Sequence, residues 1–310
     1  MSNHLSNRVA VLLAAYNGEA YLREQIETII NQVDVSVDIF ISLDTSTDNS
    51  LELLRSLSSK HTNIKLLETG KTFGSAGQNF FHLLMDVDFS SYAYVAFADQ
   101  DDIWLETKLC KAIEEIESRH IDGYSSNVIA FWEDGVQKLI SKSSPQVEFD
   151  YLFESAGPGC TFVMTLRLAT AIKQSLNTNK EGVSKLWLHD WYCYAFARKN
   201  QFEWYIDPNS FMLYRQHSAN SVGANSGFKS LSKRIEAVFS GDAFEKVIAQ
   251  ADFLGASEKK PIQYIMHNSF PSVWKLLWLS SSCRRKGKDK ILFFMAVALS
   301  FIKGGLGWGK

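Results

Sequence analysis

Apolar runs alternate with amphipathic segments through the first 120 residues of the chain. The apolar runs are short and rich in branched or aromatic residues, as in buried strands, and span Arg8–Ala14, Val37–Leu43, Ile64–Leu67 and Tyr92–Ala98. Between the runs, apolar residues recur at helical spacing, as at Leu22, Ile26 and Ile29. Strand and helix alternate four times. The pattern therefore predicts an α/β fold whose mostly parallel central sheet is flanked by helices.

The pattern changes after residue 120. Two apolar runs flank Glu133-Asp134-Gly135, whose Asp-Gly pair predicts a hairpin. Short strands are predicted over Phe202–Ile206 and Phe211–Tyr214, and a helix begins at His189-Asp190-Trp191. From about Gly227 the chain is predicted to be helical to its end. We therefore expect a first domain over 1–226, with halves at about 1–120 and 121–226, and a helical C-terminal extension over 227–310.

Three carboxylates crowd into Asp99-Gln100-Asp101-Asp102, directly after the fourth predicted strand. Like charges this close repel unless a cation neutralises them, and a divalent metal held by one or two carboxylates suits a diphosphate ligand. The alternative is a strand-to-helix connection whose aspartates cap the next helix. Ligands of such sheets bind beyond the carboxyl ends of the strands, where Tyr16 and Asp44 also lie.

Composition narrows the classes of function. The chain has 46% hydrophobic residues and a net charge of -2, which describes a globular protein and gives no reason to expect a nucleic-acid partner. Its four cysteines are scattered, so we expect free thiols in a reducing cytosol. No secretory signal is predicted at the N-terminus.

The two common glycine-rich phosphate-binding motifs are missing from the sequence. Side chains and a metal would therefore have to hold the phosphates of a bound nucleotide. Tyr16 could offer an aromatic face to a base, and Asp44 could accept a hydrogen bond from a base or a ribose. The alternatives are a strand-end packing residue for Tyr16 and a turn former for Asp44.

Several segments resemble the family 2 glycosyltransferases of GT-A fold. They are Val9–Gly18, Asp44–Asp48 and Phe97–Trp104, in that order and at similar spacing. The later segments His189–Trp191 and Tyr214–Gly223 are similar to the bacterial rhamnosyltransferase branch of that family. The resemblance covers residues 8–223. The residues beyond them carry no matching motif.

The resemblance implies a nucleotide-sugar donor and a Mg²⁺ or Mn²⁺ cofactor. The implied donor contacts are Ala15, Tyr16, Asn17, Asp44, Gln78, Asp99 and Gln100, with Tyr16 flanking the base, Asp44 bonded to it and Asp99 near the ribose. Asp101 would bind the metal, and His217 would complete the metal or diphosphate environment unless it is a structural histidine. Asp190 would be the catalytic base, with a helix-capping or surface carboxylate as the alternative. His189, Trp191 and Trp104 would frame the acceptor side.

The chain departs from the family pattern in two places. Asp44-Thr45-Ser46 stands where members commonly have Asp-Asp-Gly-Ser, so one carboxylate and the flexible glycine are missing. Gln78 lies near where many members have a basic residue directed at the diphosphate. Both departures bear on the choice of donor and leave the reaction type intact.

The implied activity is inverting transfer of a sugar to a saccharide or lipid-linked acceptor in synthesis of a bacterial cell-surface polysaccharide. The expected donor is dTDP-L-rhamnose. One alternative is another UDP- or dTDP-sugar, and another is a catalytically silent nucleotide-sugar-binding protein. A phosphatase with an Asp-x-Asp nucleophile is disfavoured, because its aspartates would follow the first strand. The expected location is the cytoplasm or the inner face of the cell membrane.

The C-terminal region combines tryptophans, a basic run and an apolar helix. The apolar run Ile291–Ile302 is twelve residues long, whereas a bilayer-spanning helix needs about 20. Trp274 and Trp278 precede the basic run Arg284–Lys290. This combination suits peripheral contact with anionic lipid. The alternatives are a helix packed on the protein and a homodimer contact.

Overall fold

The chain forms two compact units. The computed structural model describes residues 7–217 and 242–304. The first unit comprises Met1–Ser143 and Ala156–Ala224, and the second comprises Ser144–Ser155 and Asn225–Lys310. The segment Ser144–Ser155 therefore leaves the unit that surrounds it in sequence and belongs to the C-terminal helical unit.

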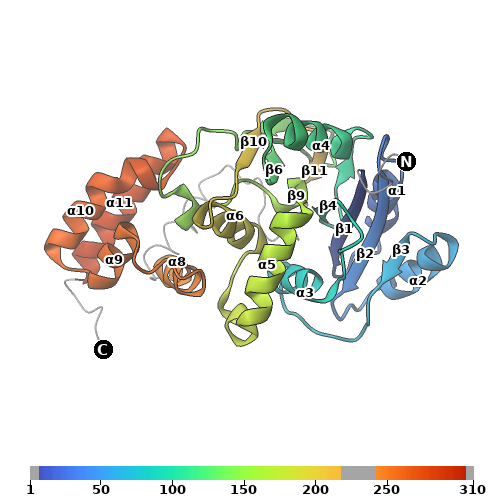
Figure 1. Ribbon diagram of the computed structural model, residues 1–310, viewed down its shortest axis with the longest axis horizontal. Coiled ribbons are helices and arrows are strands. Elements are labelled where there is room, and N and C mark those ends of the chain that lie inside the picture. Colours follow the sequence, from blue (N-terminus) through green and yellow to red (C-terminus); the bar gives the residue numbers. More distant parts are fainter. Residues whose placement is uncertain (1–6, 218–241, 305–310) are drawn as a thin grey trace. The chain divides into compact units, whose positions relative to one another are not determined.

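The first unit is built on a seven-stranded sheet with the order β10-β6-β9-β4-β1-β2-β3 (Figure 1). The strands are β1 Arg8–Ala15, β2 Ser36–Leu43, β3 Ile64–Leu66, β4 Tyr94–Ala98, β6 Gly123–Ser126, β9 Val163–Thr165 and β10 Trp204–Asp207. All neighbours are parallel except β9, which is antiparallel to β4 and to β6. The expected mostly parallel α/β sheet is confirmed.

Helices flank this sheet, and this explains why its central strands are apolar on both faces. They are α1 Leu22–Ile30, α2 Ser50–Lys60, α3 Ala76–Asp86, α4 Lys108–Arg119, α5 Leu166–Thr178 and α6 His189–Lys199, with short 3₁₀ turns at Gly159–Thr161 and Lys180–Lys185. The residues of β1 from Val9 to Leu13 are fully buried. The Ser75 hydroxyl accepts a hydrogen bond from the Gln78 N–H at the start of α3, as in a capping box.

Strand register brings the predicted site residues to one edge. Ala15, at the end of β1, pairs with Leu43 at the end of β2, and Leu13 pairs with Ala98 at the end of β4. The residues that follow these parallel strands are Tyr16, Asp44 and Asp99. They therefore leave the sheet side by side at its carboxyl edge.

A second sheet has the order β5-β11-β7-β8. Its strands are β5 Ile103–Trp104, β7 Val128–Phe131, β8 Gln137–Ile140 and β11 Met212–Arg215. The antiparallel pairing of β7 with β8 confirms the predicted hairpin. Strand β11 lies antiparallel to β5, directly after the acidic cluster, so its end brings Arg215 and His217 to that cluster.

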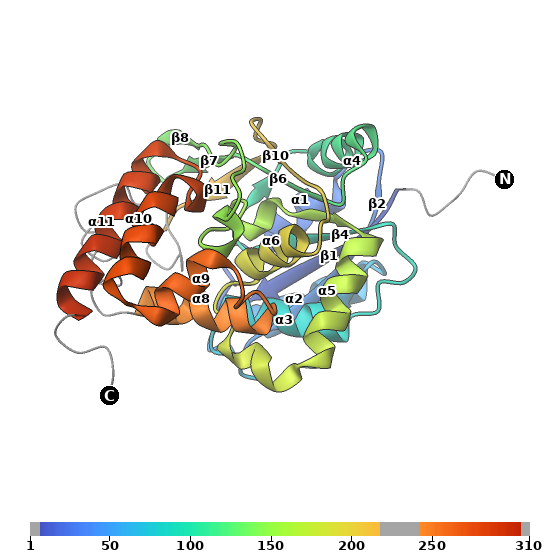
Figure 2. The same cartoon turned by 60° about the vertical axis from the view of Figure 1, so that its left-hand side comes forward.

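The second unit is helical in the residues described. Its helices are α8 Asp242–Phe253, α9 Lys260–His267, α10 Phe270–Cys283 and α11 Gly287–Gly304, together with a 3₁₀ turn at Asp150–Leu152. Helices α9, α10 and α11 pack against one another in chain order (Figure 2). Within the described part of the chain, no helix has the length and apolar character needed to cross a bilayer.

Candidate functional site

The loop after β1 presents Tyr16 to solvent on a fixed backbone. The Tyr16 N–H donates to Gln100 Oε1 at 2.8 Å, and Gln100 Nε2 donates to the Tyr16 carbonyl at 2.9 Å. The Tyr16 side chain is 55% exposed. Both polar atoms of the Gln100 amide, which was expected to contact the nucleotide, are thus hydrogen-bonded to the Tyr16 backbone. A β-carbon at Gly18 would lie 2.4 Å from Gln100 Oε1, so any larger residue at position 18 would displace the Gln100 amide from this position.

The β1 loop is also joined to the loop after β2. The Asn17 N–H donates to Ser46 Oγ at 3.0 Å, and Asn17 Oδ1 accepts from the Thr47 N–H at 2.8 Å. Asn17 has a φ of 45°, a left-handed conformation that asparagine tolerates better than most residues. Buried Ala15 contributes its carbonyl, which accepts from the Asp44 N–H at 2.8 Å. These bonds order the rim on which a donor would rest.

Asp44 is buried, and its carboxylate is hydrogen-bonded to backbone N–H groups. Its carboxylate accepts from the N–H groups of Thr45, Phe73 and Gly74 at 2.8 to 3.0 Å. Three bonds leave little capacity for a nucleobase, and contact of Asp44 with a nucleotide stays a prediction. The substituted sequence after Asp44 therefore builds a rigid turn.

Gln78 does not face a phosphate site in this structure. Its Nε2 donates to the carbonyls of Val183 at 3.1 Å and Leu186 at 2.8 Å. Both amide hydrogens are used, so none remains for the expected contact with a diphosphate. Gln78 instead fixes the segment that leads from the Lys180–Lys185 turn to α6.

The acidic cluster brings Asp101 and His217 together. His217 Nε2 lies 2.7 Å from Asp101 Oδ2, although 116 positions separate the two residues. The His217 ring also stacks on Tyr21, with ring centroids 5.2 Å apart. The sequence grouped these two residues as metal or diphosphate ligands. Their contact is observed, and ligation of a metal stays a prediction.

Arg215 holds this arrangement, and sequence reasoning missed it. Its Nε donates to the Asp101 carbonyl at 2.8 Å, and its backbone N–H donates to Asp102 Oδ1 at 3.3 Å. Its Nη2 lies 2.5 Å from Glu24 Oε2 on α1, and its guanidinium covers the Tyr21 ring. The available signal was the arginine of the Arg-Gln-His motif itself. It fixes both the loop that carries Asp101 and the strand that delivers His217.

Burial and mutual repulsion disfavour charge on two of the aspartates. Burial, and then the Asp101 carboxylate, raise the pKa of Asp99 to about 7. Burial and the Asp99 carboxylate raise the pKa of Asp102 well above its usual value. Asp102 Oδ2 has no hydrogen-bond partner among the described residues. With all its aspartates ionised, the cluster would therefore carry more negative charge than the surrounding protein groups neutralise.

Asp190 enters the same site from α6. It lies in the first turn of that helix, where the dipole favours a carboxylate, and its Oδ1 accepts from the Trp191 N–H at 2.6 Å. A β-carbon at Gly159 would lie 3.3 Å from the Asp190 Cβ, and the next residue, Cys160, belongs to the cluster of Asp99 and Asp102, so Asp190 lies beside that cluster. The site thus combines the end of β4 with the start of α6.

The residues expected on the acceptor side are buried. Trp104 is 2% exposed, Trp191 6% and His189 7%, so none of them offers a surface to an acceptor in this structure. His189 stacks on Phe80 at 3.8 Å between ring centroids, and burial lowers the pKa of His189 to about 3. These aromatic rings pack the core behind the site. Trp187, which sequence reasoning passed over, is 47% exposed and only three residues before Asp190.

A buried lysine lies behind the acidic cluster. Lys108 Nζ lies 3.5 Å from the centroid of the Trp104 ring and has no hydrogen-bond partner in the described chain. Burial lowers the pKa of Lys108 to about 7, and the neighbouring Cys160 and Asp102 side chains act in the opposite direction. The Trp104 ring therefore supports a residue near the acidic cluster rather than an acceptor.

Oxygen ligands for a divalent cation are present in this site. One ligand atom each of Asp99, Asp102 and Cys160 lies within 4.8 Å of the others. Burial raises the pKa of the Cys160 thiol, so it remains protonated and is a poor ligand. Mg²⁺ and Mn²⁺ prefer carboxylate oxygen, which the aspartates supply. The donor set therefore fits either cation.

A family model decides the classification. The model described as "Glycosyl transferase family 2" matches residues 10–176, more than half of the chain. The chain belongs to glycosyl transferase family 2. The matched region includes the loops that carry Tyr16 and Asp44 and the acidic cluster. The candidate site of this family 2 glycosyltransferase therefore lies at the carboxyl edge of its parallel strands.

Named relatives extend over nearly the whole chain. The enzyme is 40% identical over 294 residues to "dTDP-rhamnosyl transferase RfbG" of Shigella flexneri, which covers 93% of this chain and 99% of the relative. It also resembles a structure of S. aureus TarS in complex with UDP-GlcNAc, with a TM-score of 0.55 and 15% identity over 95% of this chain and 88% of that one.

A further solved structure is a mannosyltransferase from Pyrobaculum calidifontis in complex with GDP-Man and Mn²⁺. It has a TM-score of 0.50 and 13% identity over 95% of this chain and 87% of that one. At such low identity, the two structural likenesses show the fold alone. They confirm the GT-A-type architecture expected for this family 2 glycosyltransferase.

Proposed function

We propose that this enzyme transfers L-rhamnose from dTDP-L-rhamnose to a saccharide or lipid-linked acceptor in bacterial cell-surface polysaccharide synthesis, with inversion at the anomeric carbon. The observation that carries the proposal is the 40% identity to a dTDP-rhamnosyl transferase across almost the full length of both chains. The convergence of Asp99, Asp101 and Asp190 in one site supports it. A sugar-binding protein without activity would have no need of this set of carboxylates.

The chemistry assigns one step to Asp190. Its carboxylate takes the proton of the acceptor hydroxyl as that oxygen forms a bond to the anomeric carbon. The bond between the anomeric carbon and the diphosphate oxygen breaks on the opposite face of the sugar. The leaving group departs as dTDP, and no covalent intermediate on the protein is required.

A divalent cation suits the leaving-group side. Asp101, with His217 beside it, would hold Mg²⁺ or Mn²⁺, which when bound would neutralise charge on the diphosphate, and Asp99 would lie near the ribose. Arg215 fixes the backbone of Asp101, and His217 fixes its carboxylate. Exposed Tyr16 would lie against the base, on the rim formed with Asn17 and Ala15. A different UDP- or dTDP-sugar is the alternative donor.

The remaining partners follow from this assignment. Nucleotide sugars are made in the cytoplasm, so we place the reaction there, with the helical unit in peripheral contact with the inner face of the membrane. Such a location would bring the enzyme to a lipid-linked acceptor. A homodimer remains an alternative use of the same unit.

Donor preference can be measured by calorimetry. Full-length protein with Mn²⁺ should bind dTDP-L-rhamnose more tightly than UDP-glucose or GDP-mannose. Replacing Tyr16 by Ala should weaken binding by about 1–3 kcal/mol, because a base would lose its stacking partner. Tyr205→Ala, at a half-buried tyrosine on β10, serves as the control. Tighter binding of UDP-glucose would move the proposal to the alternative donor.

A further inference from the structure

Helix α10 exposes a row of large aromatic side chains. Phe270, Trp274 and Trp278 follow one another every four residues, which places them on one face of the helix. Their exposed fractions are 67%, 57% and 74%. Soluble proteins seldom leave several such side chains together in water, and such a patch marks an interaction site.

The opposite side of α10 already supplies its packing. Val273 and Leu276, which alternate in sequence with the exposed aromatic residues, are buried. Cys283, the last residue of the helix, is buried as well. Most of the surface of Trp274 and Trp278 therefore remains open to solvent and to a partner.

Helix α11 repeats the arrangement. Ile291 and Met295, again four residues apart, are 63% and 44% exposed, and Phe294 beside them is 46% exposed. Phe293 and Val297 face inward, and the Phe293 ring packs on Phe153 with centroids 4.8 Å apart. Both neighbouring helices thus carry an outward apolar stripe. We call these two stripes the apolar face.

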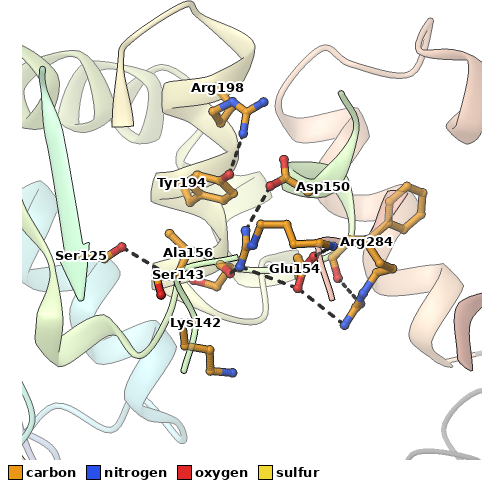
Figure 3. Close-up of polar contacts among 12 residues, drawn as sticks. Ser125, Lys142, Ser143, Asp150, Glu154, Ala156, Tyr194, Arg198 and Arg284 are labelled. Atoms are coloured by element: carbon orange, nitrogen blue, oxygen red, sulfur yellow. Dashed lines mark hydrogen bonds and ion pairs between the residues drawn. The ribbon is translucent and has the colours of Figure 1, made fainter. Parts of the chain in front are cut away.

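Two arginines of the basic run are committed to the interior of the unit. Arg285 has a side chain only 2% exposed, and its Nη1 lies 3.1 Å from Asp150 Oδ2. Arg284 Nη1 donates to the Phe153 carbonyl at 2.8 Å and lies near Glu154. Figure 3 shows Arg284 directed at Glu154 beside Asp150. The expectation that the whole basic run faces lipid is therefore corrected, because Arg285 is buried against Asp150 and Arg284 bonds to the Phe153 carbonyl.

The lysines remain at the surface. Lys275 and Lys288 are exposed, and Lys290 is half-buried. From Lys260 to Gly304 the sequence contains eight lysines and arginines but only one acid, Asp289. This part of the chain therefore has a strong positive charge, although the protein as a whole has a net charge of -2.

We infer that the apolar face, together with Lys275, Lys288 and Lys290, docks on the surface of a bilayer that contains anionic lipid. Tryptophan favours the boundary between headgroups and acyl chains, and lysines beside it attract anionic headgroups. The helices would lie on the bilayer, since none described is fit to span one. This inference deepens the proposed membrane contact and rests on it.

Charge argues against a second copy of the chain as the occupant. Two copies of this lysine-rich helical unit would bring like charges together, and those charges would repel. An anionic bilayer neutralises them instead. It also accepts aromatic and aliphatic side chains without needing a complementary shape.

Vesicle binding tests the assignment. Full-length protein should sediment with vesicles of phosphatidylcholine and phosphatidylglycerol at low salt, and much less with phosphatidylcholine alone. The triple variant Lys275→Gln, Lys288→Gln, Lys290→Gln should bind on the order of a hundredfold more weakly, because each lysine contributes about 1 kcal/mol near an anionic surface. The residual binding of this variant should depend less on salt than that of the wild type.

The aromatic row is tested separately. Trp274→Ser with Trp278→Ser should remove the salt-resistant part of binding. Trp187→Ser, at an exposed tryptophan of the first unit, should bind like the wild type. Since the substituted side chains are exposed, thermal unfolding should be unchanged. A blue shift of tryptophan fluorescence on adding vesicles should occur in the wild type and be reduced in the double variant.

Three outcomes would overturn the inference. They are failure of wild-type protein to bind the mixed vesicles, equal binding by the lysine variant, and a dimer in light scattering that the double tryptophan variant dissociates. Vesicle binding is measured without a donor. Its result is therefore independent of whether dTDP-L-rhamnose is the substrate, and either proposal can fail alone.

Discussion

At the scale of single residues, the position of Asp190 at the start of α6 separates chemistry from donor binding. Its carboxylate is held by the Trp191 N–H, and the helix dipole favours its charged form. The nucleotide rim is built by Tyr16 and Asn17, directly after β1, whereas Asp190 belongs to α6. Donor binding and acceptor activation should therefore respond to different substitutions.

Replacing Asp190 by Asn should leave donor affinity near normal and slow sugar transfer by about 10²-fold or more, because the amide cannot take the acceptor proton. Calorimetry and a transfer assay on the same preparation measure both quantities. Glu133→Gln, on the hairpin between β7 and β8, is the matched control and should change neither. Equal loss of donor affinity and rate would remove Asp190 from the role of base.

His189 makes the stability of the fold depend on pH. Burial lowers the pKa of His189 to about 3 from 6.5, so the folded state keeps it neutral while the unfolded chain takes up a proton. Its contribution is complete above pH 6.5 and falls as pH drops toward 3, by about 1.4 kcal/mol per pH unit. Urea unfolding between pH 7 and about 4.5 measures this slope.

His189→Asn should flatten that slope, and His120→Asn, at an exposed left-handed position, should retain it. An unchanged slope in His189→Asn would show that the pH dependence comes from other groups. The expectation that His189 frames the acceptor could not foresee this burial. Its stacking partner Phe80 comes from α3, more than one hundred positions away.

The residue-level predictions that succeeded share a local cause. Residues directly after parallel strands must meet at one edge, so the proximity of Tyr16, Asp44 and Asp99 follows from the strand pattern. The hydrogen bonds that each side chain makes depend on partners distant in sequence. Gln78 is taken by carbonyls beyond residue 180, and Gln100 by the backbone of Tyr16. Such pairings leave no periodic signal.

At the scale of elements, the alternation of strands and helices was sufficient to predict the parallel half of the sheet. The antiparallel β9 between β4 and β6 was not predicted, because the sequence of a three-residue strand does not indicate whether it pairs parallel or antiparallel. The segment Ser144–Ser155 was also missed. Its place in the helical unit depends on contacts with residues more than one hundred positions away, among them the buried pair of Asp150 with Arg285 and the packing of Phe153 on Phe293.

Breaking that pair should destabilise the helical unit. Arg285→Ala would leave the fully buried Asp150 carboxylate without its cation, at a cost of about 3–5 kcal/mol. Urea unfolding of the full chain measures the loss. Replacing both residues by apolar side chains, Asp150→Leu with Arg285→Met, should restore much of it. Lys288→Ala, at an exposed neighbour, should have little effect; a similar loss there would contradict the account.

At the scale of the whole molecule, the chain combines a family 2 glycosyltransferase unit with a cationic helical unit that exposes an aromatic face. The first unit offers residues that could hold a nucleotide sugar and a cation that would neutralise the negative charge of the diphosphate leaving group. The helical unit explains how the enzyme could be kept near a lipid-linked acceptor. The claim common to both is turnover of a nucleotide-rhamnose donor.

Release of dTDP from dTDP-L-rhamnose by the purified full-length protein tests that claim most directly. We expect release with Mn²⁺ or Mg²⁺, loss of release with EDTA, and recovery when metal is restored. Asp101→Ala should lower the rate by about 10²-fold or more, because it removes stabilisation of the leaving group. Glu52→Ala, at an exposed acid on α2, should not. A rate indifferent to EDTA, near-normal turnover by Asp101→Ala, or no release of dTDP by wild-type protein would contradict the account.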